Sequence, residues 1–181
     1  MDAAELENLR YPIGRFTPPA TIGKPQIREW IDELEALPGK VRDLVAHWGE
    51  DRLETPYRPD GWTVRQVVHH LADSHHNSYT RFKWALTEEN PTIKAYDEKG
   101  WAALFDSRTA PVGLSLDHLQ AVHAKLVYLL RGLAPEQLAR TFVHPETLAT
   151  SRLDENIGRY AWHGNHHLAH LRNLKERKGW D

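Results

Sequence analysis

Apolar residues recur every three or four positions in four segments of the chain, which is the pattern of amphipathic helices. The first segment begins near Pro25 and ends at about Trp48, and Pro38-Gly39 within it predicts a kink or a short break. The second begins at Val64 and contains neither proline nor glycine as far as Thr87. Thr63 is its expected N-cap, with the next turn completing a loose capping box.

The third segment begins at Ser115 and ends before Ala134-Pro135, and the fourth runs from about Leu153 to Lys178, where Gly179 is a natural stop. Strand signals are almost absent. Four principal helices of this kind predict an all-α protein, and a four-helix bundle is the simplest architecture that buries their apolar faces. The length of 181 residues is that of a single domain covering residues 1–181.

Three other segments are irregular in pattern. Residues 1–23 contain prolines and glycines that we take to exclude a regular helix, which predicts an extended arm. Tyr11, Ile13 and Phe16 could attach it to a surface, either of its own bundle or of a partner's. Residues 88–114 and 134–152 form connections long enough to cross the end of a bundle or to cover a site. A short helix is expected in the middle of the first, from Tyr96 to Phe105.

The composition excludes several classes of function. A hydrophobic content of 40% and a net charge of −2 indicate an ordinary globular chain with no electrostatic preference for nucleic acid or an anionic membrane. No apolar run has the length of a membrane span, and the start MDAAELENLR is unlike a secretion signal. The chain has no cysteine, which excludes disulfides, thiolate nucleophiles and iron–sulfur clusters. A cytoplasmic protein is expected.

Histidine is the unusual residue, because eight of the twelve fall in two short segments of the second and fourth predicted helices. His163 and His167 are four residues apart, so their imidazoles lie on one face of the helix and could share a metal ion. His166 and His170 have the same spacing but point elsewhere. The apolar stripe includes Gly164, which is expected to leave room for an ion or substrate.

A third ligand has to come from another helix. His70 lies in a polar strip beside the apolar stripe of the second helix, and such a strip at a bundle interface needs a partner such as a metal. His75 is the rival: it could be a ligand, an outer partner of a ligand, or a hydrogen-bonded core histidine. His69 and His76 have the spacing of solvated positions.

The HGNHH segment resembles the HExxH motif of zinc proteases, but Gly164 stands where the general base belongs, so a protease of that type is not expected. Three imidazoles leave coordination positions open, as in catalytic metal sites. Asp73, Asn77 and His123 are candidates for orienting the ligands, and two acidic residues of the last helix, Asp154 and Glu155, are further ones. His123 lies on the apolar face of the third helix, where a hydrogen-bonded core histidine is the commoner outcome.

Long blocks of the sequence resemble the DinB/YfiT-like superfamily, and most closely its YfiT branch, whose members are described as metal-dependent hydrolases. The blocks are LRYPIGRF, GWTVRQVVHHLADSHHNSYTRFKWALTEENPTIKAYDE, TFVHPE and YAWHGNHHLAH, in that order. The resemblance implies a four-helix bundle in which His70, His163 and His167 bind one nickel or zinc ion per subunit. It also implies that homodimers are common.

Three functions remain open at this point. The first is a metal-dependent hydrolase in which the ion activates water. The second is an S-transferase acting with a low-molecular-weight thiol such as bacillithiol, which a pocket lined by Arg81, Lys83 and Arg159 would favour. The third is a non-catalytic module that binds metal or a small molecule, with the ion enclosed by a fourth ligand such as His75 or Glu146.

Overall fold

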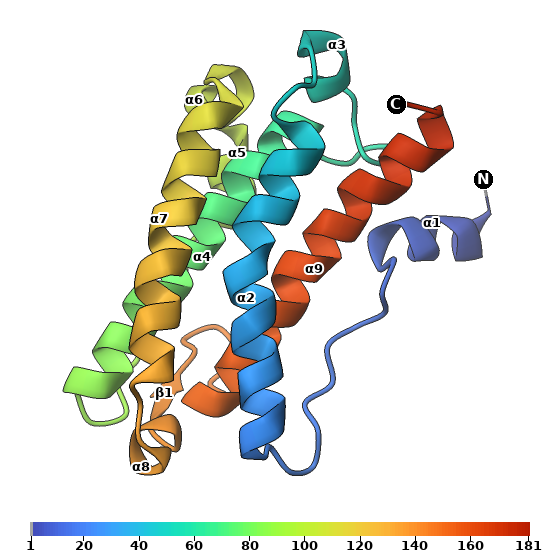
Figure 1. Ribbon diagram of the computed structural model, residues 1–181. Coiled ribbons are helices and arrows are strands. Elements are labelled where there is room, and N and C mark those ends of the chain that lie inside the picture. The colour runs from blue at the N-terminus through green and yellow to red at the C-terminus, as the bar shows by residue number, and fades with distance from the viewer. Residues whose placement is uncertain (1) are drawn as a thin grey trace.

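Four long helices form the body of the protein in the computed structural model, which describes residues 2–181 (Figure 1). They are α2 (Lys24–Val45), α4 (Val64–Thr87), α7 (Val112–Arg131) and α9 (Leu153–Lys178). The colours of Figure 1 show α2 and α9 running one way and α4 and α7 the other. The predicted four-helix bundle is confirmed. No helix among the described residues has the length and apolar character needed to cross a membrane.

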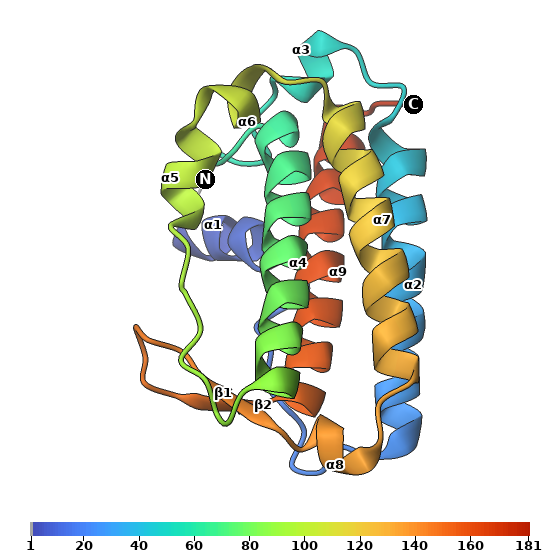
Figure 2. The same cartoon turned by 90° about the vertical axis from the view of Figure 1, so that its left-hand side faces the viewer.

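The order of the helices around the bundle is not their order along the chain. Helix α2 packs against α7 and α9, and α4 packs against the same two, so that α2 and α4 are diagonal to each other. Two of the three connections therefore cross the bundle diagonally at its ends. The third, residues 88–111, returns along the whole length of the bundle because α4 and α7 run parallel (Figure 2). These are the long crossover connections that the sequence predicted.

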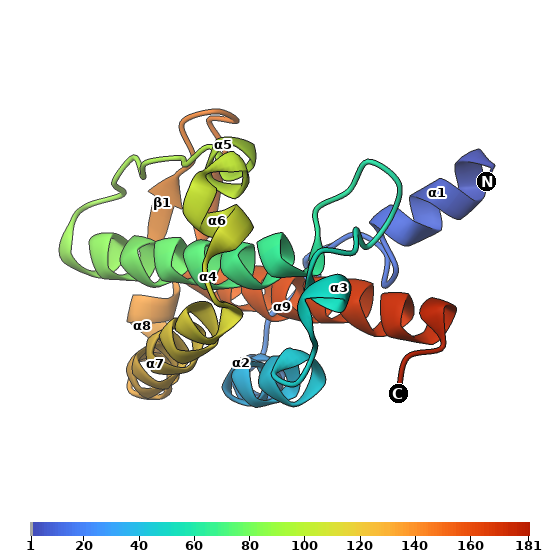
Figure 3. The same cartoon turned by 90° about the horizontal axis from the view of Figure 1, so that it is seen from above.

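Shorter elements complete the fold. They are α1 (Ala3–Arg10), α3 (Glu50–Leu53), α5 (Glu98–Ala103), α6 (Phe105–Thr109), α8 (Pro135–Leu138), β1 (Thr141–Val143) and β2 (Thr150–Arg152). The strands pair antiparallel, with Phe142 opposite Ser151. Seen from above, α4 and α9 lie between α2 and α7 on one side and α1, α5, α6 and β1 on the other (Figure 3). One face of the α4–α9 pair is thus covered only by short elements and connections.

The N-terminal segment departs from the prediction of an extended arm over residues 1–23, because residues 3–10 are helical. Asp2 caps this helix: its carboxylate accepts a hydrogen bond from the backbone N–H of Glu5 (2.7 Å), and the Glu5 carboxylate accepts one from the backbone N–H of Asp2 (2.8 Å). The prolines and glycines all follow, from Pro12 onward, so they exclude a helix only after residue 10.

The segment after α1 lies along α9 of its own bundle, through two of the three side chains that were predicted to attach it. The ring of Tyr11 lies 5.8 Å from that of His166, and the ring of Phe16 lies 6.3 Å from that of Trp162. Ile13 is exposed instead. The N-terminal segment therefore covers the histidine-rich stretch of α9.

The helix boundaries follow the sequence signals closely. Thr63 caps α4 in a complete capping box with Gln66, and α9 ends at Gly179, whose φ of +61° is left-handed. Helix α2 is continuous through Pro38 and is not broken. Helix α7 begins three residues before the predicted Ser115.

A buried polar layer divides the apolar core into two clusters. One cluster includes Leu37, Val41, Val68, Leu119 and Leu171, and the other includes Leu34, Phe82, Leu126, Ile157 and Tyr160. Between them along α4 and α7 lie buried polar side chains, Ser74, His75 and Ser78 on α4 and His123 on α7. Because buried polar groups are tolerated only when hydrogen-bonded, this layer needs an internal network of partners.

Gly164 serves the packing of α2 on α9, not the room beside the histidines that the sequence suggested. A Cβ atom at this position would lie 2.3 Å from Cδ2 of Leu37. We expect Gly164→Ala to destabilise the fold by about 1–3 kcal/mol through overpacking, measured by urea unfolding. The control is Gly39→Ala on α2, where a Cβ meets nothing within 4 Å and a gain of about 0.5–1 kcal/mol is expected. Equal effects of the two substitutions would contradict this account.

Candidate metal centre

Three histidines from two helices converge on the face of the α4–α9 pair that the short elements cover. Nε2 of His70 lies 3.2 Å from Nε2 of His163, and one ring nitrogen from each of His70, His163 and His167 lies within 4.8 Å of the other two. Two imidazole nitrogens bound to one tetrahedral zinc ion at about 2.0–2.1 Å are roughly 3.3 Å apart. The spacing of His70 and His163 therefore suits a shared divalent ion.

Burial keeps these imidazoles in the neutral form that binds metals. It lowers the pKa of His70 to about 4, with a smaller effect from His166, and it lowers the pKa of His163 and His167 well below the usual value. The cluster contains no carboxylate. The donor set is thus three neutral nitrogens, which is the ligand set of an open zinc-type site.

A chain of hydrogen bonds fixes the ring of His163. The backbone carbonyl of Leu34 on α2 can only accept, so Nδ1–H of His123 donates to it (2.5 Å). Nε2 of His123 then accepts from Nδ1–H of His75 (2.8 Å), and Nε2 of His75 accepts from Nδ1–H of His163 (3.2 Å). This network assigns the tautomer of each ring and leaves Nε2 of His163 with a free lone pair facing His70.

A second chain fixes His167 in the same way. Nε2–H of His170 donates to the backbone carbonyl of Arg10 (3.1 Å), the last residue of α1. Nδ1 of His170 can then accept from Nδ1–H of His167 (3.4 Å), which leaves Nε2 of His167 for a metal. Both chains end on a backbone carbonyl of an element outside the α4–α9 pair, so the bundle and the N-terminal segment both orient the ligands.

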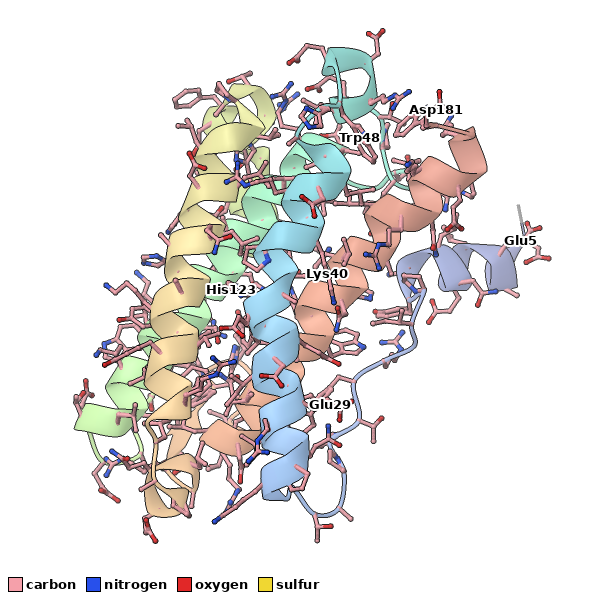
Figure 4. All side chains as sticks on the ribbon, viewed as in Figure 1. Glu5, Glu29, Lys40, Trp48, His123 and Asp181 are labelled. Atoms are coloured by element: carbon pink, nitrogen blue, oxygen red, sulfur yellow. The ribbon has the colours of Figure 1, made fainter. Side chains whose placement is uncertain are left out.

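His75 is an outer partner of His163 and not a member of the triad, since both of its ring nitrogens face other imidazoles. His123 is the buried, hydrogen-bonded core histidine that its position predicted. Figure 4 labels His123, which is on α7 at the side that faces α2. The polar layer of the core is therefore the support of the candidate metal centre.

We expect His75→Ala to weaken zinc binding by about 10- to 100-fold, the usual effect of removing a partner that orients a ligand. Competition with a chromogenic chelator measures this affinity. His76→Ala is the control on the same helix, because His76 is exposed and its ring contacts His118 (3.0 Å). An unchanged affinity in His75→Ala would contradict the proposed chain of hydrogen bonds.

The predictions for the other histidines of these two helices are partly right. His69 was predicted to be solvated, and this is wrong: it is buried, with Nδ1 2.7 Å from the hydroxyl of Ser115 and Nε2 3.2 Å from the carbonyl of Ala110. His76 is exposed, as predicted. His166 and His170 are outside the triad but line the same cavity, and both are buried, with Tyr11 against His166 and the carbonyl of Arg10 bound to His170.

The acidic and amide candidates for orienting the ligands do not contact the triad. The side chain of Asn77 donates to the backbone carbonyl of Asp73 (2.9 Å), and burial raises the pKa of Asp73 to about 6, with a further contribution from Asp106. Asp154 pairs with Arg152 at the hairpin, and Glu155 pairs with Arg159 (2.7 Å). No hydrogen bond joins any of these four candidates to His70, His163 or His167 within residues 2–181.

Two adjoining cavities open on the triad. The first, of about 560 Å³, is lined by all three histidines and by an aromatic wall of Tyr11, Tyr57, Trp62 and Trp162. The second, of about 570 Å³, extends from His163 toward Arg81, Tyr96 and the loop that joins β1 to β2. Glu98, Lys99 and Trp162 line both. The triad thus lies where a small molecule can reach it.

Sequence reasoning missed most of this lining. Glu98 and Lys99 are in the 88–114 connection, and Tyr57 and Trp62 are in the loop before α4. The ring of Trp62 lies 4.7 Å from that of His70. The spacing of apolar residues does not predict where such loops lie. The only local signal in ETPYRPDGW is its content of turn-forming residues, which predicts a tight turn but not its position beside His70. Arg81 and Arg159 line the second cavity as predicted, whereas Lys83 does not.

A family model described as DinB superfamily matches residues 33–171. The chain belongs to the DinB superfamily. Within it, the chain is 50% identical over 173 residues to a Bacillus subtilis protein named "Putative metal-dependent hydrolase YfiT", covering 96% of this chain and 97% of that one. It is 51% identical over 173 residues to an Oceanobacillus iheyensis relative whose name also reads "Putative metal-dependent hydrolase", covering 96% of this chain and 99% of that one.

The solved structure of Bacillus subtilis YfiT matches this DinB-superfamily fold with a TM-score of 0.94 and 50% identity, over 96% of this chain and 99% of that chain. That protein is described as a probable metal-dependent hydrolase with an unusual four-helix bundle topology. The family resemblance seen in the sequence is confirmed.

Proposed function

We propose that this DinB-superfamily protein is a hydrolase that depends on one divalent ion, zinc or nickel, held by His70, His163 and His167. The observation that carries the proposal is the convergence of three neutral imidazoles on one cavity, with a second cavity reaching His163 and no carboxylate in the triad to complete the coordination. An ion bound in this way would supply Lewis acidity and would lower the pKa of water. The names of the relatives support the same reaction class.

The side chains around the triad supply the other requirements of a hydrolase. The hydrogen-bond chains through His75 and His170 hold the ligand rings in place. Trp62 and Trp162 form apolar surface against which the non-reacting part of a substrate can pack. Glu98 is a carboxylate that lines both cavities, as His163 does, and we assign it the transfer of a proton to or from the substrate.

Metal-dependent turnover is the test of this proposal. Metal-free protein, prepared with a chelator and without a histidine tag, is reloaded with zinc or nickel and assayed against 4-nitrophenyl esters and anilides. We expect turnover that needs the metal and is lost in His163→Ala. Glu98→Gln should keep the metal and lose turnover. Turnover that is equal with and without metal would contradict the proposal.

A second candidate is S-transfer from a low-molecular-weight thiol. The observation that favours it is the presence of Arg81 and Arg159 in the second cavity, since thiols such as bacillithiol carry carboxylates. Metal-dependent consumption of bacillithiol in the presence of an electrophile, with no ester or amide hydrolysis, would support this candidate over the first.

A further inference from the structure

Arg81 is a buried cation without an anionic partner. Its side chain is on α4, and only 9% of the residue is exposed. Nη1 donates to the hydroxyl of Tyr160 (3.2 Å), while Nε is buried without a hydrogen-bond partner. No carboxylate within the described residues forms an ion pair with it. A buried charge in this state is strongly unfavourable unless something pairs with it.

Arg65, on the same helix, is a buried arginine whose charge is paired within the protein, and it serves as a comparison for Arg81. It is 3% exposed, and Nε donates to the carboxylate of Glu54 (2.6 Å). A second carboxylate, from Glu50, and the backbone carbonyl of Ala110 satisfy the rest of its guanidinium. The positive charge of Arg65 is thus paired with carboxylates of the chain itself. The charge of Arg81 is not, so its partner would have to come from outside the chain.

The environment of Arg81 is a site with several donors. It lines the second cavity together with the buried hydroxyl of Ser74 and the partly buried Tyr96. Nδ1 of His144, which lines the same cavity, is also buried without a partner. Burial lowers the pKa of His144, with further lowering by the charge of Arg81, so His144 is neutral at pH 7 and one of its ring nitrogens can donate.

The distribution of charge selects the kind of anion. The acidic residues of this cavity, Asp97, Glu98 and Glu146, are exposed, and so are two basic ones, Lys99 and Arg159. The deep wall carries one buried positive charge, on Arg81. A singly charged carboxylate matches this guanidinium and its planar pair of donors, whereas a doubly charged phosphate would bring a second negative charge that the buried wall does not pair.

We propose that Arg81 binds a carboxylate group of the substrate in the cavity that it shares with His163. This rests on the proposed function, and it narrows the substrate class to small molecules in which a carboxylate lies a short distance from the bond that reacts. His163 is one turn of α9 from Tyr160, the hydrogen-bond partner of Arg81, so both ends of such a molecule are bound within one cavity.

The test compares two probes that differ in one charge. Monomethyl glutarate carries a carboxylate and an ester, and dimethyl glutarate carries two esters. Binding to the zinc-loaded protein is measured by calorimetry in wild type, Arg81→Gln and Lys83→Gln, the last being an exposed lysine on α4 outside the cavity. We expect wild type and Lys83→Gln to bind monomethyl glutarate more tightly than dimethyl glutarate. Arg81→Gln should bind monomethyl glutarate about 10- to 100-fold more weakly than wild type does, and its affinity for dimethyl glutarate should be unchanged.

Hydrolysis of the two esters is followed by chromatography in the same samples, so binding and turnover are scored separately. Preferential monoacid binding without ester hydrolysis would uphold the carboxylate site and count against the hydrolase. Equal binding of the two probes, or tighter binding of inorganic phosphate, would overturn the carboxylate assignment. The melting temperature gives a second readout: Arg81→Gln should not fall below Lys83→Gln, because no ion pair is lost, whereas a structural role would make it markedly less stable.

Discussion

His163→Ala should weaken zinc binding by more than about 100-fold, beyond the 10- to 100-fold that follows from losing an outer partner of a ligand. His163 contributes a nitrogen that lies 3.2 Å from its counterpart on His70, and its Nδ1–H is the end of the chain through His75. Its removal takes away one of three ligands and leaves His75 without its hydrogen-bond donor. No other described side chain is placed to replace it in the triad.

Chelator competition measures this loss, with His70→Ala and His118→Ala in parallel. His70→Ala should lose metal as His163→Ala does, while His118→Ala should bind as wild type because His118 is exposed and contacts only His76 among the histidines of the described chain. If His70→Ala kept its metal and His75→Ala lost it, the third ligand would be His75 and the assigned tautomers would be wrong.

The metal-free protein should lose several kcal/mol of folding free energy as the pH falls from 6.5 to 4. Burial lowers the pKa of His70 and of His123 from 6.5 to about 4, and it lowers the pKa of His75, His163 and His167 well below the usual value. Between these pH values the unfolded chain binds protons that the folded chain does not, so acid favours unfolding. A shift of this size corresponds to about 3 kcal/mol for each fully buried group.

Urea unfolding of the metal-free protein at pH 7, 6 and 5 measures this dependence. Asp73 acts in the opposite direction, because burial raises its pKa to about 6 and its protonation stabilises the fold as the pH falls, but it is one group against several. His123→Gln should make the dependence shallower by removing one titrating group, and His76→Ala should not change it. Stability that is constant over this range would show that the buried histidines are not neutral in the folded protein.

The helices that the sequence predicted best are those whose local signals agree. Helix α4 has an uninterrupted apolar period and the Thr63 capping box, and α9 has a stop at Gly179. The candidate ligands followed because His163 and His167 are one turn apart, a local property of the helix. Helix α1 was missed because its capping box, Asp2 with Glu5, is weaker evidence at the sequence level than the prolines that follow it.

The surroundings of the ligands depend on which helices are neighbours, and periodicity does not specify this. His75 and His123 hydrogen-bond because α4 and α7 are parallel neighbours, which results from the long 88–111 connection. The same connection buries His69, since the carbonyl of Ala110 covers a side of α4 that a simple bundle would expose. Arg81 has the sequence position of an ordinary helix residue, and only the packed structure shows that it lacks an anion.

Anomalous diffraction from crystals grown with zinc tests the central claim most directly. The account predicts one strong peak per chain at about 2.0–2.1 Å from Nε2 of His70, His163 and His167. It also predicts that His75 and His170 stay outside the coordination sphere, hydrogen-bonded to two of the ligands. A map with no peak among the three histidines, or with zinc bound only at His76 and His118 on the surface, would contradict it.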